Sequence, residues 1–199
     1  VFQNPDNQII GTSVEEDVAF GPENKNIEPE KIRKIVETVL RKVKLWDRRK
    51  ASPSILSGGQ KQRLATADAL AGLPACLVLD EPTAMLDPDS RKEVINIVKE
   101  LNRKEGMTII LITHHTDEVV DADRIVLMKD GKIIGDDIPK KIFADYELLK
   151  KAKMDIPPVV ELGMRLEKQQ IGLEGPVLQE QEMIEKIVKL YRSKCGGKK

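Results

Sequence analysis

Two short stretches decide the fold of this chain: Leu-Ser-Gly-Gly-Gln-Lys-Gln-Arg at residues 56–63 and Leu-Val-Leu-Asp-Glu-Pro-Thr-Ala-Met-Leu-Asp at residues 77–87. An Ala- and Leu-rich segment of helical length separates them. The order predicts a helix whose N-terminus can hold an anion, then a buried strand, then two acidic side chains at the end of that strand. Because ligands of open α/β sheets bind beyond the carboxyl ends of the strands, this arrangement predicts a phosphate-handling site in an α/β protein.

Composition excludes several classes of protein. With 199 residues, the chain is long enough for one globular domain and an appendage. Its content of 40% apolar and 33% charged residues is typical of a globular protein rather than of a disordered or membrane-spanning one. Its 33 basic and 33 acidic residues cancel and aromatic residues make up 3%, so we expect no nucleic acid among its partners. No signal peptide or bilayer-length apolar run is seen, so we expect a cytosolic protein that reaches a membrane through a partner.

The two cysteines give no sign of a disulfide framework or a metal site. Cys76 begins an apolar strand, and we expect it to be a small core residue. Cys195 lies in a Lys- and Gly-rich tail, and neither cysteine has a neighbour at metal-ligand spacing.

Apolar periodicity and turn residues predict alternating helices and strands. Helices are expected from a cap at Thr12 or Ser13 to Gly21-Pro22, and then at 29–43, 58–73, 88–105, 139–143, 146–153, 159–168 and 178–192, with a short one ending near Val120. Strands are expected at 75–79, 107–112, 124–128 and 132–134, the last two joined by an Asp130-Gly131 hairpin turn. The pattern predicts an α/β fold whose parallel sheet is covered on both faces and has an antiparallel edge, followed by a small helical appendage from about residue 139.

Ser57-Gly58-Gly59-Gln60 is the candidate phosphate contact. Two glycines let backbone N–H groups approach a phosphate closely, Ser57 can donate a further bond, and the helix behind adds its positive end. For these four residues alone, an ordinary helix cap after a loop is the commoner explanation. The full string from Leu56 to Arg63 is much rarer and favours the phosphate site.

Asp80 and Glu81 are the candidate catalytic acids. An Asp at the end of a buried strand can hold Mg²⁺ directly or through water, and a neighbouring Glu can orient and deprotonate water for attack on a γ-phosphate. An Asp-Glu pair is usually surface acid, but the four apolar residues before this pair and the Pro-Thr after it favour a site.

His114 and Gln3 are weaker candidates. His114 follows the neighbouring predicted strand and could donate a hydrogen bond to phosphate oxygens, although a lone His is more often structural and His115 leaves the choice between the two open on chemistry alone. Gln3 follows the end of a predicted strand. A glutamine in a loop is normally just solvated, and Gln3 is singled out only by the other candidate residues that accompany it.

The motifs and their order resemble the second half of an ABC transporter ATPase. The resemblance rests on Leu-Ser-Gly-Gly-Gln-Lys-Gln-Arg, Cys-Leu-Val-Leu-Asp-Glu-Pro-Thr, Leu-Asp-Pro and Ile-Thr-His-His, in that order. Val-Phe-Gln-Asn-Pro-Asp-Asn-Gln, Asp-Val-Ala-Phe-Gly-Pro-Glu-Asn, Pro-Lys-Lys-Ile-Phe and Asp-Ile-Pro-Pro-Val-Val-Glu-Leu are similar to the ATP-binding subunits of energy-coupling-factor transporters, which import vitamins, cobalt and nickel. The resemblance covers nearly the whole chain and thins after about Leu173.

This resemblance implies a P-loop NTPase-like ABC ATPase domain at residues 1–138. Its helical subdomain, at about 4–73, would receive a coupling helix from a transmembrane subunit, and residues 139–199 would form the helical appendage and tail. The implied partners are a second ABC ATPase, identical or paralogous, the transmembrane coupling subunit and a separate substrate-binding membrane subunit. ATP and Mg²⁺ are the implied ligands, and the implied location is the cytoplasmic face of the cell membrane.

The resemblance also implies a role for each candidate residue. Gln3 would touch Mg²⁺ or the attacking water and sense the membrane partner, Asp80 would support Mg²⁺, and Glu81 would be the catalytic base. The signature residues would bind the γ-phosphate of ATP held by the opposite subunit: Ser57, Gly58, Gly59 and Gln60. Asp87 would reach across the dimer, and His114 would be the switch histidine.

One departure from the family is large, because the sequence contains no Gly-x-x-x-x-Gly-Lys-Ser/Thr. That loop, whose N–H groups and Lys hold the β- and γ-phosphates, should precede Gln3 together with the residue that stacks on adenine. We therefore expect an N-terminally truncated ATPase domain, and we expect residues 1–199 alone to bind ATP poorly and to be inactive.

Two other functional classes stay open from the sequence. One is the ATPase of another ABC system or of DNA repair or translation, although the coiled-coil insertions or tandem cassettes usual in the non-transport ABC ATPases are not visible here. The other is a non-enzymatic regulatory fragment that dimerises through its C-terminal helices.

Overall fold

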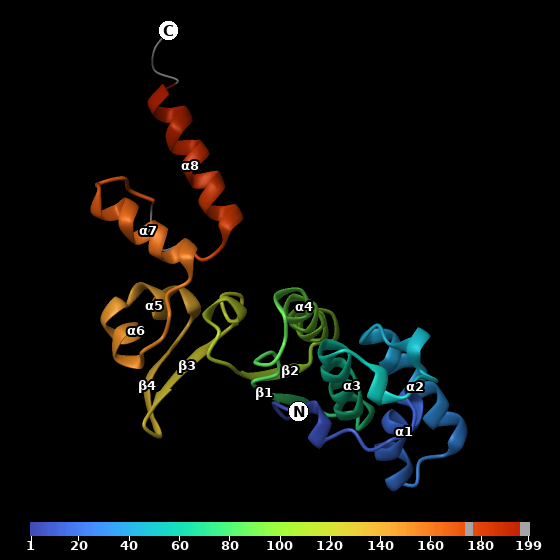
Figure 1. Cartoon of the computed structure of the whole chain (residues 1–199). Coiled ribbons are helices and arrows are strands. Elements are labelled where there is room, and N and C mark those ends of the chain that lie inside the picture. The colour runs from blue at the N-terminus through green and yellow to red at the C-terminus, as the bar shows by residue number, and fades with distance from the viewer. Residues whose placement is uncertain (174–176, 196–199) are drawn as a thin grey trace. The chain divides into compact units, whose positions relative to one another are not determined.

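The computed structural model describes residues 1–173 and 177–195, with the side chains of residues 193–195 left out. The chain divides into two compact units, Val1–Thr113 and His114–Lys199, and each is described by itself (Figure 1). The predicted domain boundary at residue 138 stays a prediction.

The first unit alternates helices with two strands, as the sequence predicts. Its elements are η1 (Pro5–Asn7), α1 (Val14–Asn24), α2 (Pro29–Lys42), η2 (Trp46–Arg48), η3 (Pro53–Ile55), α3 (Gly58–Ala71), β1 (Cys76–Asp80), α4 (Pro88–Glu105) and β2 (Thr108–Ile112). The predicted helix signals are present: Ser13 caps α1, Pro29 begins α2 and Asp87 caps α4. Gly106 ends α4 in the left-handed region at φ 66°.

The predicted stop of the first helix at Gly21-Pro22 is wrong. α1 runs through Pro22 and ends at Asn24. Pro22 is buried in the last turn, so its missing N–H removes only one helical hydrogen bond before the helix ends.

The sheet of the first unit is parallel. β1 pairs with β2 in a register that places Asp80 beside Ile112, so both strands end at the same edge. On the other side of β1, the Val1 nitrogen donates to the Val78 carbonyl at 2.8 Å, and the Asp80 nitrogen donates to the Val1 carbonyl at 3.0 Å. These two bonds follow the parallel pattern, and they confirm the strand-like start of the chain.

The buried face of this sheet packs against the helices. A single apolar cluster joins Leu77 and Leu79 of β1 to residues of α1, α2, α3 and α4. The other face is bare among the described residues: Val78, Ile110 and Ile112 are each more than two-fifths exposed. The prediction of a strand covered on both faces is therefore wrong for this chain, and so is the core position of Cys76, which is exposed.

The second unit begins with a hairpin. It contains η4 (Thr116–Glu118), β3 (Ile125–Lys129), β4 (Lys132–Asp137), α5 (Pro139–Ala144), α6 (Tyr146–Ala152), α7 (Pro158–Lys168) and α8 (Glu180–Cys195). The predicted turn is confirmed, with Asp130 at φ 49° and Gly131 at φ 73°. β3 and β4 form their own antiparallel sheet rather than the predicted edge of the parallel sheet, because the tight turn lets the two strands pair locally.

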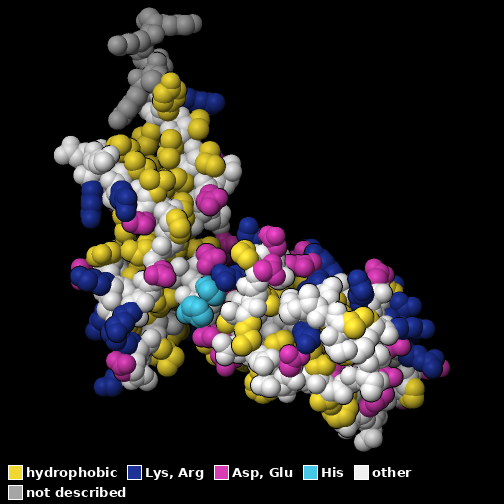
Figure 2. Space-filling model, viewed as in Figure 1, with side chains coloured by type: hydrophobic (Ala, Val, Ile, Leu, Met, Phe, Trp, Pro, Cys, Tyr) yellow, Lys and Arg dark blue, Asp and Glu magenta, His cyan; other side chains and the backbone are white. Residues whose placement is uncertain are grey.

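The helices α7 and α8 carry an apolar surface. Met183 of α8 is buried with Leu173 and Val177. The residues of the predicted common face of α8 are not members of this cluster: Ile184, Ile187, Val188 and Tyr191 are between 41% and 68% exposed. Figure 2 shows hydrophobic side chains gathered over these two helices. None of the helices in the described part of the chain is long and apolar enough to cross a membrane.

Candidate functional site

Gln3 and Glu81 meet at the carboxyl end of β1. The Gln3 side-chain amide donates a hydrogen bond from Nε2 to Glu81 Oε2 at 2.9 Å. Glu81 has a positive φ of 44°, in the left-handed region that disfavours a side chain by roughly 1–3 kcal/mol. Its nitrogen donates to the Ile112 carbonyl at 2.8 Å, which ties this strained turn to the end of β2. The structure therefore joins two predicted site residues that the sequence separates.

Asp80 is the last residue of β1 and is exposed at the same sheet edge. Mg²⁺ prefers one or two carboxylates together with phosphate and water oxygens, so an exposed Asp at the end of the strand fits its chemistry. No group of three or more His, Cys, Asp or Glu side chains gathers at metal-binding range within residues 1–173 and 177–192. This donor set suits an ion shared with a phosphate rather than a closed protein cage.

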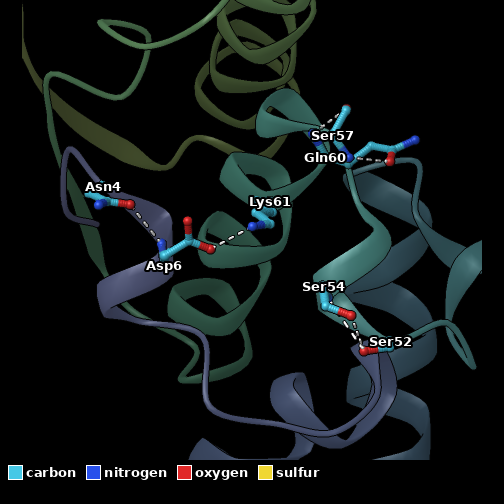
Figure 3. Close-up of polar contacts among 7 residues, drawn as sticks. All are labelled: Asn4, Asp6, Ser52, Ser54, Ser57, Gln60 and Lys61. Carbon is cyan, nitrogen blue, oxygen red and sulfur yellow. Dashed lines mark hydrogen bonds and ion pairs between the residues drawn. The ribbon is translucent and has the colours of Figure 1, made fainter.

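The N-terminus of α3 is built by a reciprocal cap (Figure 3). The Gln60 nitrogen donates to Ser57 Oγ at 3.3 Å, and the Ser57 nitrogen donates to Gln60 Oε1 at 3.0 Å. Ser57 and Gly58 are exposed. The ordinary cap and the predicted phosphate contact are thus compatible, because the cap orders the first turn while its outer surface stays accessible.

Gly59 has a packing role that the sequence did not indicate. It is buried, and a Cβ at this position would lie 2.7 Å from both Cβ and Oγ of Ser90 on α4. The absence of a side chain therefore brings the first turns of α3 and α4 together.

The same first turn of α4 is capped by Asp87. Its carboxylate accepts hydrogen bonds from the nitrogens of Ser90 at 3.0 Å and Asp89 at 3.1 Å. Hydrogen bonds from the side chain and backbone of Ser90, and from the Asp89 backbone, lower the pKa of the Asp87 carboxyl. Ser90 thus links the predicted residues Gly59 and Asp87.

A small cavity of about 140 Å³ separates these elements. Its lining comes from the loop that begins with Gln3, from the first turn of α3, and from the segment 82–86. This volume is too small for a whole nucleotide.

The side chains of α3 hold the loop that contains Gln3. Lys61 forms an ion pair from Nζ to Asp6 Oδ1 at 2.7 Å (Figure 3). The backbone nitrogen of Asp6 donates a hydrogen bond to Asn4 Oδ1 at 3.0 Å, which orders the loop at Asp6. The buried Gln62 donates to the Phe2 carbonyl at 3.4 Å. Sequence reasoning missed these residues, although Lys61 and Gln62 lie within the motif that it quoted.

His114 is the first residue of the second unit. Its ring centroid lies 4.1 Å from that of His115, with the two rings tilted by 39°. The preceding strand β2 ends beside Asp80, two residues before His114. The role of His114, and the choice between the two histidines, stay predictions.

Comparison with known proteins points to one family. The profile of the ABC transporter family matches residues 1–84. An energy-coupling factor transporter ATP-binding protein, EcfA1, of Caldanaerobacter subterraneus subsp. tengcongensis is 55% identical over 94% of this chain and 68% of the relative. EcfA1 of Clostridium novyi is 50% identical over 96% of this chain and 68% of the relative.

Two solved structures share the fold. The protein cbiO1 from Clostridium perfringens, described as part of the ABC transporter complex cbiONQ, superimposes with a TM-score of 0.70 at 38% identity, over 84% of this chain and 66% of that one. An ATP-binding cassette solved as a dimer with ADP and Pi gives a TM-score of 0.60 at 30% identity, over 70% of this chain and 61% of that one. The chain thus spans about two thirds of the length of the relatives that it matches.

Proposed function

This chain belongs to the ATP-binding proteins of energy-coupling factor transporters, within the ABC transporter family, and from that premise we propose that it powers import through membrane partners by hydrolysing ATP. The family's members are ATP hydrolases coupled to transport. The parallel sheet and its flanking helices agree with the fold of the solved relatives.

The observation that carries the proposal is the hydrogen bond between Gln3 and Glu81. Glu81 is the general base in this proposal: it accepts a proton from the water that attacks the γ-phosphate. Its left-handed backbone and its bond to Gln3 hold the carboxylate at the sheet edge, where a base must be preorganised. Gln3 Oε1 remains to orient the same water.

Asp80 and Gln3 would hold Mg²⁺, the ion that neutralises phosphate charge when bound. Asp80 supports this assignment because it is an exposed carboxylate at the strand end, one residue before Glu81.

Ser57, Gly58, Gly59 and Gln60 would bind the γ-phosphate of ATP held by a second ATPase subunit, with Asp87 placed across the same interface. The exposure of Ser57, Gly58 and Asp87 supports this, because groups that serve a partner subunit must be accessible in a single chain. The close contact between Gly59 and Ser90 holds the N-terminal caps of α3 and α4 in a fixed position relative to each other. His114 would contact the γ-phosphate of this subunit's own ATP.

The proposed assembly contains two ATPase subunits, identical or paralogous, a transmembrane coupling subunit and a substrate-binding membrane subunit. The dimeric relative and the membership of cbiO1 in a transporter complex support such an assembly. The chain would act at the cytoplasmic face of the membrane, in the import of a vitamin or of cobalt or nickel ions.

The test is Glu81→Gln in the full-length protein assembled with its partner ATPase. Glutamine keeps the size of the side chain and removes the base, so we expect ATP hydrolysis to fall by about 10²–10⁴-fold while ATP binding persists. Turnover is measured by phosphate release and binding by equilibrium titration.

Glu100→Gln is the matched control. Glu100 lies on α4, where it pairs with the exposed Lys104 at 3.3 Å. Its replacement should leave turnover unchanged, and a Glu81→Gln protein with normal turnover would remove Glu81 from the role of base.

A further inference from the structure

Two buried carboxyl groups, Asp17 on α1 and Asp68 on α3, are not used by the proposed reaction. Asp17 is 3% exposed, and its Oδ2 and both carboxyl oxygens of Asp68 are buried and find no hydrogen-bond donor among the surrounding N–H and hydroxyl groups. Within the described residues, no Lys, Arg or His forms an ion pair with either group. A pair of bare carboxylates in such surroundings would be strongly disfavoured by desolvation and mutual repulsion.

The pair resolves this conflict by holding a proton. Burial, followed by the charge of Asp17 and a hydrogen bond to it, raises the pKa of Asp68 from 3.8 to about 9. At neutral pH Asp68 therefore carries an O–H group that can donate to Asp17.

Asp17 uses its other oxygen to hold the backbone that leads from the Gln3 loop into α1. Its Oδ1 accepts hydrogen bonds from the nitrogens of Ile10 at 2.8 Å and Gly11 at 2.6 Å. A Cβ at Gly11 would lie 2.5 Å from the Asp17 nitrogen, so the glycine permits this approach.

The same segment also contacts α3 directly. Gln8 donates from Nε2 to the carbonyl of Ala65 at 2.6 Å. Ala65 lies about one turn before Asp68 on α3. Residues 8–11 are therefore held from two sides, by α1 and by α3.

We propose that Asp68 and Asp17 form a proton-dependent latch, in which the Asp68 O–H donates to Asp17 and so fixes residues 8–11 between α1 and α3. The carboxyl latch, meaning Asp17 and Asp68 together, makes Asp68 a positioning residue for the loop that carries Gln3. The link to Gln3 rests on the proposed function, whereas the latch itself does not.

The groups that face Asp68 are few. From α1 it is faced by the charge of Asp17, and from the segment before α1 by the neutral amide of Gln8. On α3 itself the positions one turn away are Leu64 and Gly72, neither of them charged, and Lys25 from the end of α1 donates to the Gly72 carbonyl at 2.9 Å. Within the described residues, no third His, Cys, Asp or Glu joins the pair at metal-binding range.

The sign of the pH effect follows from linkage. Because the pKa of Asp68 is higher in the folded chain than in an unfolded one, folding takes up a proton between these two values. The stabilisation is complete below the unfolded pKa of 3.8 and is lost as the pH rises through about 9. Above that pH Asp68 is ionised and can no longer donate to Asp17, so residues 8–11 should loosen.

The experiment measures hydrogen exchange of a peptide spanning residues 8–13 in the full-length protein, corrected for the pH dependence of unstructured amides. In the unaltered protein we expect protection to fall at least about tenfold as the pH rises through 9, which is the effect of weakening a buried hydrogen bond to a charged group. Protection that stays constant through this range would overturn the latch.

Two variants distinguish the effect of removing the titrating proton from the effect of removing the hydrogen-bond donor. Asp68→Asn keeps a neutral donor to Asp17 and removes the titration, so its protection should match the unaltered protein at pH 7 and stay constant at higher pH. Asp68→Ala removes the donor, so protection should fall at least about tenfold already at pH 7. Asp130→Asn, in the exposed hairpin turn, is the control and should retain the pH response.

Turnover tests the link to Gln3. In the assembled transporter, Asp68→Ala should lower kcat for ATP with little change in KM, and Asp68→Asn should restore it. Faster exchange in Asp68→Ala with an unchanged kcat would overturn the positioning role and leave the latch. Absence of turnover in the unaltered protein would instead refute the proposed function, and the exchange results would still decide the latch.

Discussion

The helices α3 and α8 have similar lengths but very different surroundings. α3 has 14 residues, and nine of them are buried. Three of the nine are polar. Gln62 and Arg63 bind other segments, Gln62 by donating to the Phe2 carbonyl and Arg63 by donating to the Val43 carbonyl and to Glu93, whereas Thr66 donates to the Gln62 carbonyl within α3. α8 has 16 residues and buries Met183, while Ile184, Ile187, Val188 and Tyr191 stay exposed.

This contrast shows two ways in which a helix can serve a protein. α3 is surrounded, so its buried polar side chains must find partners, and one of these partners is the carbonyl of Phe2, next to Gln3. α8 packs on one side, so its remaining apolar face contributes little to the stability of this chain. The comparison therefore predicts that equal truncations in the two helices have unequal effects.

The largest effect is expected for Leu64→Ala in α3. Leu64 is fully buried in the main cluster, so removing its side chain leaves a cavity and should lower the free energy of unfolding by about 2–5 kcal/mol. Urea denaturation of the full-length protein measures the change. A loss below about 1 kcal/mol would mean that α3 is less enclosed than the structure indicates.

Gly59→Ala should have an intermediate effect. The added methyl group would lie 2.7 Å from Ser90, and such overpacking costs about 1–3 kcal/mol in unfolding free energy. Gly58→Ala is the matched control, since its Cβ would meet Leu86 at an ordinary 3.5 Å. The double variant Gly59→Ala with Ser90→Gly should recover part of the loss, and failure to recover would place the strain elsewhere.

The smallest effect is expected for Ile187→Ala in α8. Ile187 is 41% exposed, so the truncation should change the free energy of unfolding by less than about 1 kcal/mol when the chain is studied alone. The same denaturation experiment checks it. A loss as large as that of Leu64→Ala would show that the exposed face of α8 is covered in solution.

Much of the fold could be predicted from the sequence because its signals are local. Caps such as Ser13 and Asp87, the proline at position 29 and the Asp130-Gly131 turn act within a few residues, and all four were confirmed. What covers an apolar side chain depends on segments far away in the chain, so the exposure of Cys76 and of the α8 face was not predictable from periodicity.

The candidate site was predictable only in part, because some of its residues have local signals and others depend on contacts between distant segments. Glu81 was identified from its place after an apolar strand, and Gln3 only through the resemblance, yet the structure joins them. Asp68 looks like a single acid in an Ala- and Leu-rich helix, and nothing in its neighbours along the chain names Asp17 as its partner. Contacts of this kind depend on how α1 packs on α3, which one sequence does not specify.

The hydrogen bond from Gln3 to Glu81 spans 78 positions in the chain, and this distance has a consequence for folding. Closing so long a loop costs conformational entropy before any contact at its ends is gained, so such contacts form after the intervening helices have organised. In a partly folded chain in which α1, α2 and α3 are not yet packed, Gln3 and Glu81 are not paired at the end of β1. The Gln3–Glu81 pair is therefore one of the last features that the folding chain acquires.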